Sequence, residues 1–437
     1  MALFDKYHAI LGETEPARRT GQVRQVVGLV AECEGLSIPV GALCEIGSSA
    51  GRVRCEAVGF REDVSLLMPL SEMEGVRHGD PVVCLATTQR VPVGRALLGR
   101  IIDSEGRPVD GGPPAVPDAA APLFARPPRP LERDLIREPL STGVRAIDAL
   151  LTCGKGQRLG LFSGSGVGKS TLLGMMARYT SADVTVVGLV GERGREVRSF
   201  VEKDLGPDGL RRSVVVVETS DRPALLRVKA AFAATAVAEF FRDQGNDVLL
   251  LMDSVTRACN AQREIGLSAG EPPATKGYPP SVFALLPRLM ERAGRAARGS
   301  ITGLYTVLVE GDDMNEPISD TSRSILDGHV WLARSLAIRG HYPAVDPLTS
   351  ISRLMVDVAD AEHLAAATRV RSALATHKDA EDLINVGAYV KGSNPEIDAA
   401  VRAMPAINAF LRQAVTDGAG FEQVKQGLLA VAKEIHA

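Results

Sequence analysis

The sequence has few aromatic residues and no marked excess of either charge. Aromatic residues make up 4% of its 437 residues, and the stretch from 21 to 85 contains only Phe60. Aromatic side chains are the platforms on which single-stranded nucleic acids stack, and the net charge of −3 lacks the basic excess of nucleic-acid binders. We therefore expect no nucleic-acid partner.

Cysteine is also scarce, and long apolar runs are missing. The six cysteines form no CxxC pair and no cluster with histidine, which predicts buried, reduced thiols rather than disulfides or a zinc site. No apolar run approaches the ~18–20 residues of a membrane-spanning helix. Charges begin at Asp5, unlike the start of a secretory signal. These features predict a cytoplasmic protein.

The first third of the chain alternates short β-branched runs with glycine-centred turns. After an N-terminal extension (1–20), this spacing predicts a small β-barrel over 21–95. A linker over 96–137 follows, and its proline-rich part, Gly111–Pro130, is expected to form no element of its own. The barrel strands are expected at Val23–Val30, Gly41–Ile46, Val53–Val58, Val64–Met68 and Pro81–Leu85.

The pattern changes over residues 138–356 to buried strands that alternate with longer helices such as Pro223–Asp243. Continuous apolar runs of this kind predict a parallel sheet covered on both faces, in the α/β class. Segments rich in alanine, leucine and charge then predict a C-terminal helical domain over 357–437. The core strands are expected at Val184–Val190, Ser213–Glu218, Val248–Met252 and Leu304–Val309.

A glycine-rich loop joins an apolar strand to the predicted helix Thr171–Tyr179. Small residues let successive N–H groups point at phosphate oxygens, Lys169 reaches the β- and γ-phosphates, and the Ser170 hydroxyl holds Mg²⁺. The pattern asks for glycine where this chain has Ser163. We predict a site for a nucleoside triphosphate with Mg²⁺, to which Thr171 also belongs. The loop reads Ser163, Gly164, Ser165, Gly166, Val167, Gly168, Lys169 and Ser170.

Two predicted core strands end in carboxylates. Asp253 follows an apolar strand, at the edge where α/β sheets bind ligands. It either binds Mg²⁺ through water or caps the next helix, and its position 84 residues after Lys169 favours the metal. Glu192 either polarises the water that attacks the γ-phosphate, with Arg193 against the phosphates, or belongs to a solvated charged turn. Spacing alone favours the turn.

The segment 340–353 holds two further candidates. Tyr342 lies in a rigid loop bracketed by proline, where it either stacks on adenine or packs on its neighbours. Arg353 has, by itself, the features of a surface arginine.

From about Glu138 to Met355 the chain resembles the superfamily of rotary ATP synthases and type III export ATPases. The likeness is greatest to the flagellar protein-export ATPase and its injectisome relatives. Weaker similarity covers residues 92–100 and 392–398. The motifs that carry the resemblance lie at residues 142–148, 163–170, 191–198, 251–257 and, most specific to export ATPases, 270–283.

The resemblance implies a RecA-like P-loop core between the barrel and the helical domain, assembled as a homo-hexameric ring. Glu192 then matches the catalytic glutamate, and Arg193 the arginine beside it that contacts phosphate. Tyr342 matches the aromatic residue on adenine, and Arg257 an arginine near the phosphates. Arg353 matches the arginine finger that reaches a neighbour's nucleotide.

The implied function is ATP hydrolysis that energises flagellar type III protein export, unloading chaperones and promoting substrate entry. The implied partners are a stator-like regulatory protein, a central stalk protein, chaperones, substrates and the membrane proteins of the export gate, which suggests peripheral attachment at the inner face of the membrane. An injectisome ATPase is the alternative. A hexameric RNA helicase of termination-factor type disagrees with the scarcity of barrel aromatics, and a non-catalytic ring subunit disagrees with Glu192.

Overall fold

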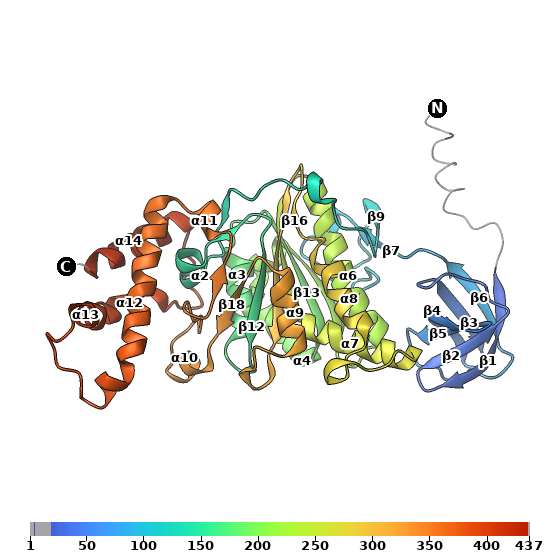
Figure 1. Ribbon diagram of the computed structural model, residues 1–437. Coiled ribbons are helices and arrows are strands. Elements are labelled where there is room, and N and C mark those ends of the chain that lie inside the picture. The colour runs from blue at the N-terminus through green and yellow to red at the C-terminus, as the bar shows by residue number, and fades with distance from the viewer. Residues whose placement is uncertain (1–3, 5–18, 436–437) are drawn as a thin grey trace.

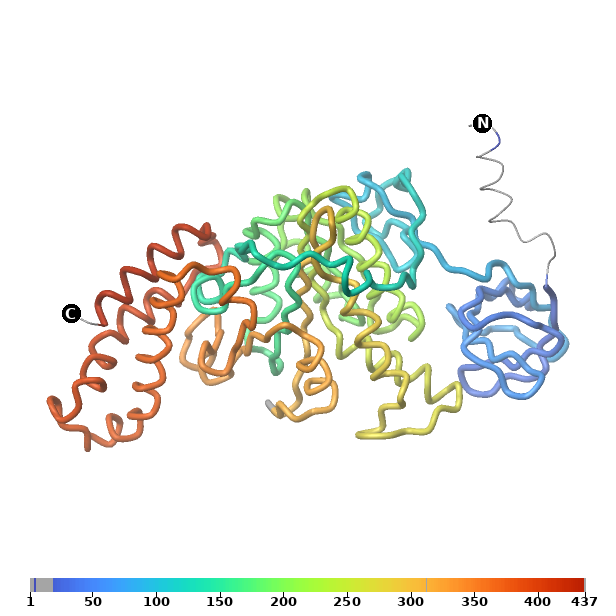
Figure 2. Tube along the Cα trace, turned by 45° about the horizontal axis from the view of Figure 1, so that its top comes forward, coloured from blue at the N-terminus to red at the C-terminus, as the bar shows by residue number. Residues whose placement is uncertain are grey.

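The computed structural model describes residue 4 and residues 19–435, so most of the predicted N-terminal extension lies outside the described residues. A barrel, a central α/β region and a group of helices follow one another from one end of the molecule to the other (Figure 1). The turned view keeps this order (Figure 2). The predicted fold class, an α/β core between an N-terminal β-barrel and C-terminal helices, is confirmed.

The N-terminal region is a closed six-stranded barrel whose interior is filled by small and medium apolar side chains, four buried cysteines among them. The prediction of one strand at Val23–Val30 is wrong. Gly28 adopts φ +58°, a conformation that favours glycine, and the resulting turn separates β1 from β2. In spatial order the strands are β1 (Thr20–Val27), β2 (Val30–Glu34), β5 (Val64–Pro69), β4 (Gly51–Arg61), β3 (Leu43–Ser48) and β6 (Pro81–Ala86).

The segment expected to be a plain linker contributes strands. Strand β8 (Ile101–Ile102) pairs with the edge of the central sheet, and β9 (Ala119–Pro122) pairs antiparallel with β7 (Arg90–Val93). The prediction that Gly111–Pro130 forms no element is therefore wrong. Its three successive alanines keep the N–H donors that strand pairing needs, and Pro122 stands at the strand end, where a missing donor is tolerated.

The core is a nine-stranded sheet in which the strands from β18 to β8 run parallel. Strand β19 pairs antiparallel at one edge, and β16 (Gly294–Arg295) pairs antiparallel with β17. The long central strands are buried along nearly their whole length, which explains their continuous apolar sequence. The order is β19 (Ile351–Ser352), β18 (Gly328–Leu332), β12 (Arg158–Ser163), β17 (Ser300–Leu308), β15 (Asp247–Asp253), β13 (Val184–Glu192), β14 (Ser213–Thr219) and β8.

Helices cover both faces of the sheet and enclose two separate apolar cores. Helices α6, α7 and α8 pack in the first core, and α2 and α3 pack in the second together with the C-terminal helices. A short β-ladder joins β10 (Pro139–Leu140) to β11 (Cys153–Gly154). The helices are α2 (Arg145–Leu150), α3 (Lys169–Tyr179), α4 (Gly194–Ser199), α5 (Gly206–Arg211), α6 (Ala224–Asp243), α7 (Val255–Ala269), α8 (Pro280–Met290), α9 (Pro317–Ile325), α10 (Arg334–Ile338), α11 (Met355–Val358), α12 (Ala361–Asn385), α13 (Pro395–Leu411) and α14 (Phe421–Glu434).

Two buried ion pairs fix long-range contacts of α6. Lys229 lies 2.6 Å from Glu56 of β4, and so joins the core to the barrel. Arg292 is fully buried and donates to both oxygens of Glu239, at 2.9 and 2.5 Å, and to the carbonyl of Leu123 at 2.7 Å. Each buried cation thus has its own carboxylate, as the cost of burying charge requires.

Candidate active site

The glycine-rich loop lies between the end of β12 and the start of α3. Gly166 and Gly168 adopt φ +78° and +91°, which favours glycine and turns the chain sharply into the helix. The unpaired N–H groups of the 11-residue helix then face the loop and favour an anion there. Ser163 was predicted to be the first residue of the loop. In the structure it is the last residue of β12, and its side chain is fully buried.

Four of the predicted residues meet at the carboxyl ends of the parallel strands. The ammonium of Lys169 lies 2.5 Å from Asp253 and 3.9 Å from Glu192. Arg257, from the first turn of α7, donates to the two oxygens of Glu192 at 2.9 and 3.2 Å. Two carboxylates and two cations therefore form one connected cluster at the start of α3.

A bulge in β13 directs Glu192 into this cluster. The pairing of β13 with β14 shifts register between Val190 and Glu192, and Gly191 in between adopts φ +67°. A β-bulge bends the strand and so changes the direction in which the next side chain points. A Cβ on Gly191 would lie 3.3 Å from the side chain of Arg257, so glycine also lets that arginine approach.

Burial raises the pKa of the Glu192 carboxyl to about 7, and the nearby Asp253 carboxylate adds to the rise while Lys169 and Arg257 oppose it. Asp253 is 3% exposed, and its Oδ1 also accepts a 2.7 Å hydrogen bond from Thr306 of β17. The sequence reasoning missed Thr306, because a threonine inside an apolar strand has no motif around it.

A cavity of about 460 Å³ adjoins the glycine-rich loop. Tyr342 is 46% exposed, and its ring lies against Gly168, where a Cβ on that glycine would be 3.5 Å from the ring. The structure thus brings Tyr342 to the loop. The cavity is lined by Gly166, Val167, Gly168, Thr171, Leu172, Met175, Leu332, Tyr342, Pro343, Ala344, Gln413, Ala414 and Val415.

The last three of these residues, 413–415, come from the segment after α13 and were not predicted. The only hint in the sequence would have been their place in a helical domain that packs beside the loop. The backbone N–H of Gln413 donates to the carbonyl of Tyr342 at 2.9 Å, and its side-chain amide donates to the carbonyl of Gly143 at 2.8 Å. The C-terminal helices therefore help to build the cavity.

Arg193 and Arg353 lie away from both the cluster and the glycine-rich loop. The Arg193 side chain is 72% exposed and lies 3.7 Å from Glu196. Arg353 is exposed and follows the edge strand β19; its backbone N–H donates to the carbonyl of Asp327, next to the start of β12. The loop begins at the other end of β12, roughly 17 Å away along the strand. Ser170 stands exposed in the first turn of α3.

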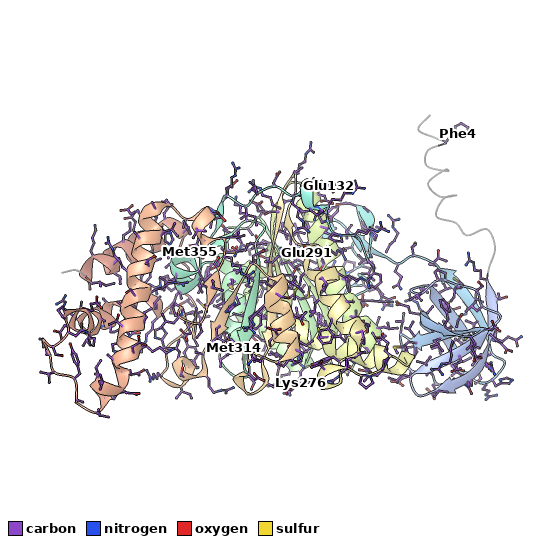
Figure 3. All side chains as sticks on the ribbon, in the orientation of Figure 1. Phe4, Glu132, Lys276, Glu291, Met314 and Met355 are labelled. Carbon is purple, nitrogen blue, oxygen red and sulfur yellow. The ribbon has the colours of Figure 1, made fainter. Side chains whose placement is uncertain are left out.

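The motif at residues 270–283 forms the connection between α7 and α8. Tyr278 donates to Asn260 at 3.2 Å, and Glu271 accepts the N–H of Ser281 at 3.2 Å, so both ends of the connection are tied to helices. Between them the chain is exposed, and Lys276 lies at the margin of the core (Figure 3).

Comparison with known proteins agrees with this geometry. Residues 143–352 match the nucleotide-binding domain of the ATP synthase alpha/beta family, and residues 359–430 match the T3SS EscN ATPase C-terminal domain. A flagellum-specific ATP synthase of Bacillus subtilis is 53% identical over 94% of both chains. The chain belongs to the family of flagellar and type III secretion ATPases.

Relatives from both branches of the family are similar to the chain. A type 3 secretion system ATPase of Xanthomonas euvesicatoria is 48% identical over 95% of both chains. The solved structure of assembled EscN with its central stalk EscO, from enteropathogenic E. coli, superposes with a TM-score of 0.88 at 45% identity, over 94% of this chain and all of that one. In the described part of the chain, no helix has the length and apolar character to span a bilayer.

Proposed function

We propose that this chain hydrolyses ATP to energise protein export through a flagellar type III secretion apparatus. The observation that carries the proposal is the cluster of Lys169, Glu192 and Asp253 beside a helix N-terminus and a cavity walled by Tyr342. Relatives of both branches are similar to the chain, and the higher identity, 53% against 48%, is to the flagellar one. An injectisome ATPase is the second candidate.

In this proposal the loop N–H groups and Lys169 hold the β- and γ-phosphates, and the base stacks on Tyr342. The residues present also fit Mg²⁺. Ser170 is exposed in the first turn, and among the described residues no donor reaches the second carboxylate oxygen of Asp253. Such oxygen donors suit a hard cation. Mg²⁺ bound to ATP supplies neutralisation of the charge that develops on the phosphates.

Glu192 is the residue that orients and polarises the attacking water. A general base works best with a pKa near the working pH, and the pKa of about 7 meets that condition. Arg257 acts as a positioning residue, because its two hydrogen bonds hold the carboxylate in one orientation. Arg193 is assigned to the phosphates by family resemblance, and it must turn inward from its exposed position to reach them.

Arg353 serves a neighbouring subunit. It lies at the opposite ends of the strands from its own loop, so it cannot complete its own site, yet it is exposed at the sheet edge. A chain that carries both the glycine-rich loop and the arginine finger can form every site by self-association in a closed ring. A homo-hexamer is therefore proposed, and the assembled EscN structure supports it.

The remaining partners are proposed from the family. EscN was solved with its central stalk EscO, and we propose an equivalent stalk protein here. A stator-like regulator, export chaperones, substrates and export-gate proteins complete the proposed set. The proposed location is the cytoplasm, with peripheral attachment at the inner face of the membrane.

Replacing Lys169 by Ala in the source cell tests the proposal. We expect secreted flagellar subunits to disappear from the medium and swimming to stop, because the phosphates lose their cation. Lys391→Ala is the matched control and should export normally, because this lysine is exposed in the connection between α12 and α13. Intact filaments with missing secreted effectors would instead assign the protein to an injectisome.

A further inference from the structure

A second cavity, of about 370 Å³, lies behind the loop that carries Tyr342. Its walls are α10, the segment 339–348, and one face each of α12 and α13. It therefore lies between the core and the C-terminal helices. We refer to it as the rear cavity. The side chains that matter below are Arg339, His341, Lys378, Glu381, Asn408 and Arg412.

The rear cavity has cations that no carboxylate neutralises. Arg339 is paired with Glu381 at 2.8 Å. Lys378 and Arg412, in contrast, have no carboxylate partner among residues 19–435. The other acid of the wall, Asp346, accepts the backbone N–H of Leu348 and keeps its negative charge, so the lining holds three cations and two carboxylates. Lys378 and Arg412 are exposed and have no carboxylate partner among the described residues, and the lining as a whole carries a net positive charge, which favours an anion.

A buried histidine lies in the wall of the same cavity. His341 is only 5% exposed, and its ring has no hydrogen-bond partner in the described part of the chain. The rings of His329 and His363, by comparison, each contact a backbone carbonyl, at 2.9 and 2.8 Å. The ring nitrogens of His341 are not among the fully buried atoms that lack a partner, so they reach the surface of the cavity and are free to bind a ligand there. Burial, and then Arg412, lower the pKa of His341, so the neutral ring offers one N–H donor.

We propose that the rear cavity binds a small oxyanion of the phosphate class, held by Lys378, Arg412 and His341. The amide of Asn408 supplies a further donor from α13. Two charged donors and two neutral ones match the several acceptor oxygens of such an anion.

The occupant is coupled to the nucleotide site because the two cavities share walls. His341 lines the rear cavity, and the next residue, Tyr342, lines the cavity beside the glycine-rich loop. In the same way Arg412 lines the rear cavity, and the next residue, Gln413, lines the cavity beside the loop. A 2.9 Å hydrogen bond joins the two segments, from the N–H of Gln413 to the carbonyl of Tyr342. An anion that fixes His341 and Arg412 therefore fixes the wall on which adenine rests, and the coupling must be reciprocal.

Titration calorimetry of the full chain with inorganic phosphate tests the site. The protein is first saturated with Mg²⁺ and the non-hydrolysable analogue AMP-PNP, which fills the phosphate positions at the loop. We expect one phosphate to bind per subunit, and Lys378→Gln with Arg412→Gln to weaken it at least tenfold. Lys391→Gln should leave binding unchanged. No binding to the wild type, or equal binding to the double variant, would overturn the proposal.

The coupling has its own readout. Phosphate should shift the dissociation constant of a fluorescent ADP analogue by about fivefold or more in the wild type and not in the double variant. The single variant Lys378→Gln removes an exposed side chain and keeps the fold, so it still tests the site if the double variant is unstable. The inference rests on nucleotide binding but not on export. Failure of AMP-PNP to bind would contradict the proposed function, whereas failure of phosphate alone contradicts only this inference.

Discussion

Two sets of buried charges in this molecule are built differently. In the first, around α6, each cation has its own carboxylate: Lys229 pairs with Glu56, and Arg292 with Glu239. In the second, at the glycine-rich loop, partners are shared. Lys169 lies near both Asp253 and Glu192, and Glu192 is also bound by Arg257.

This difference indicates that the charges around α6 stabilise the fold, whereas the charges at the glycine-rich loop serve the reaction. One-to-one pairs compensate their own burial, so removing one member leaves an isolated charge. The shared cluster leaves Glu192 with a raised pKa, which means that its surroundings disfavour the ionised form. Such a carboxylate does little for stability and is suited to act as a base.

The largest expected effect concerns Arg353, which we propose a neighbouring subunit supplies to the site. Arg353→Ala should lower ATP hydrolysis by roughly 10³–10⁵-fold while ATP still binds, because a finger stabilises charge only in the transition state. Phosphate release at saturating ATP measures the loss.

Mixing two inactive variants shows whether the finger acts across subunits. Rings that combine Arg353→Ala with Lys169→Ala subunits contain some interfaces with an intact loop and an intact arginine. Part of the activity should return on mixing. If the mixture stays as inactive as either variant, Arg353 does not act in trans.

Substitutions in the ion pairs around α6 should lower the free energy of unfolding rather than the activity. Lys229→Met should cost about 3–5 kcal/mol of unfolding free energy, because Glu56 is left buried without its cation. Thermal unfolding measures the change. The double variant with Glu56→Met should regain most of the loss, and a double variant as unstable as the single one would mean that packing, not charge, sets the cost.

The smallest effect is a pH dependence. The folded pKa of Glu192, about 7, is above its ordinary 4.5, so the stability from its protonated form is complete below pH 4.5 and is lost as pH rises through 7. Activity follows the opposite direction, since the ionised form is the base. We expect kcat/KM to rise with pH up to about 7 and then level off. A flat profile between pH 5.5 and 8 would contradict the assignment.

The sequence predicted most of the fold and part of the site. Long apolar strands such as β13 and the Gly166–Gly168 loop have strong local signals, and they were found. The rest depended on contacts distant in sequence. Thr306 gains its role only because β17 lies beside β15, and Gln413 gains its role only because the C-terminal helices pack on the Tyr342 loop.

Some predictions failed or stay open for similar reasons. The pairing of β9 with β7 joins residues about thirty positions apart, which composition cannot show. The role of Arg353 requires a second subunit, so neither the sequence nor one chain can demonstrate it.

The most direct test compares Glu192→Gln with Glu239→Gln, each by ATP hydrolysis and by thermal unfolding at pH 8. Both replace a buried carboxylate by an amide of the same shape. We expect Glu192→Gln to lower hydrolysis by roughly 10²–10⁴-fold and to leave the unfolding temperature unchanged or higher. Glu239→Gln should lower the unfolding temperature, because Arg292 stays buried without a counter-charge. Retained turnover in Glu192→Gln, or a matching fall in its unfolding temperature, would contradict the account.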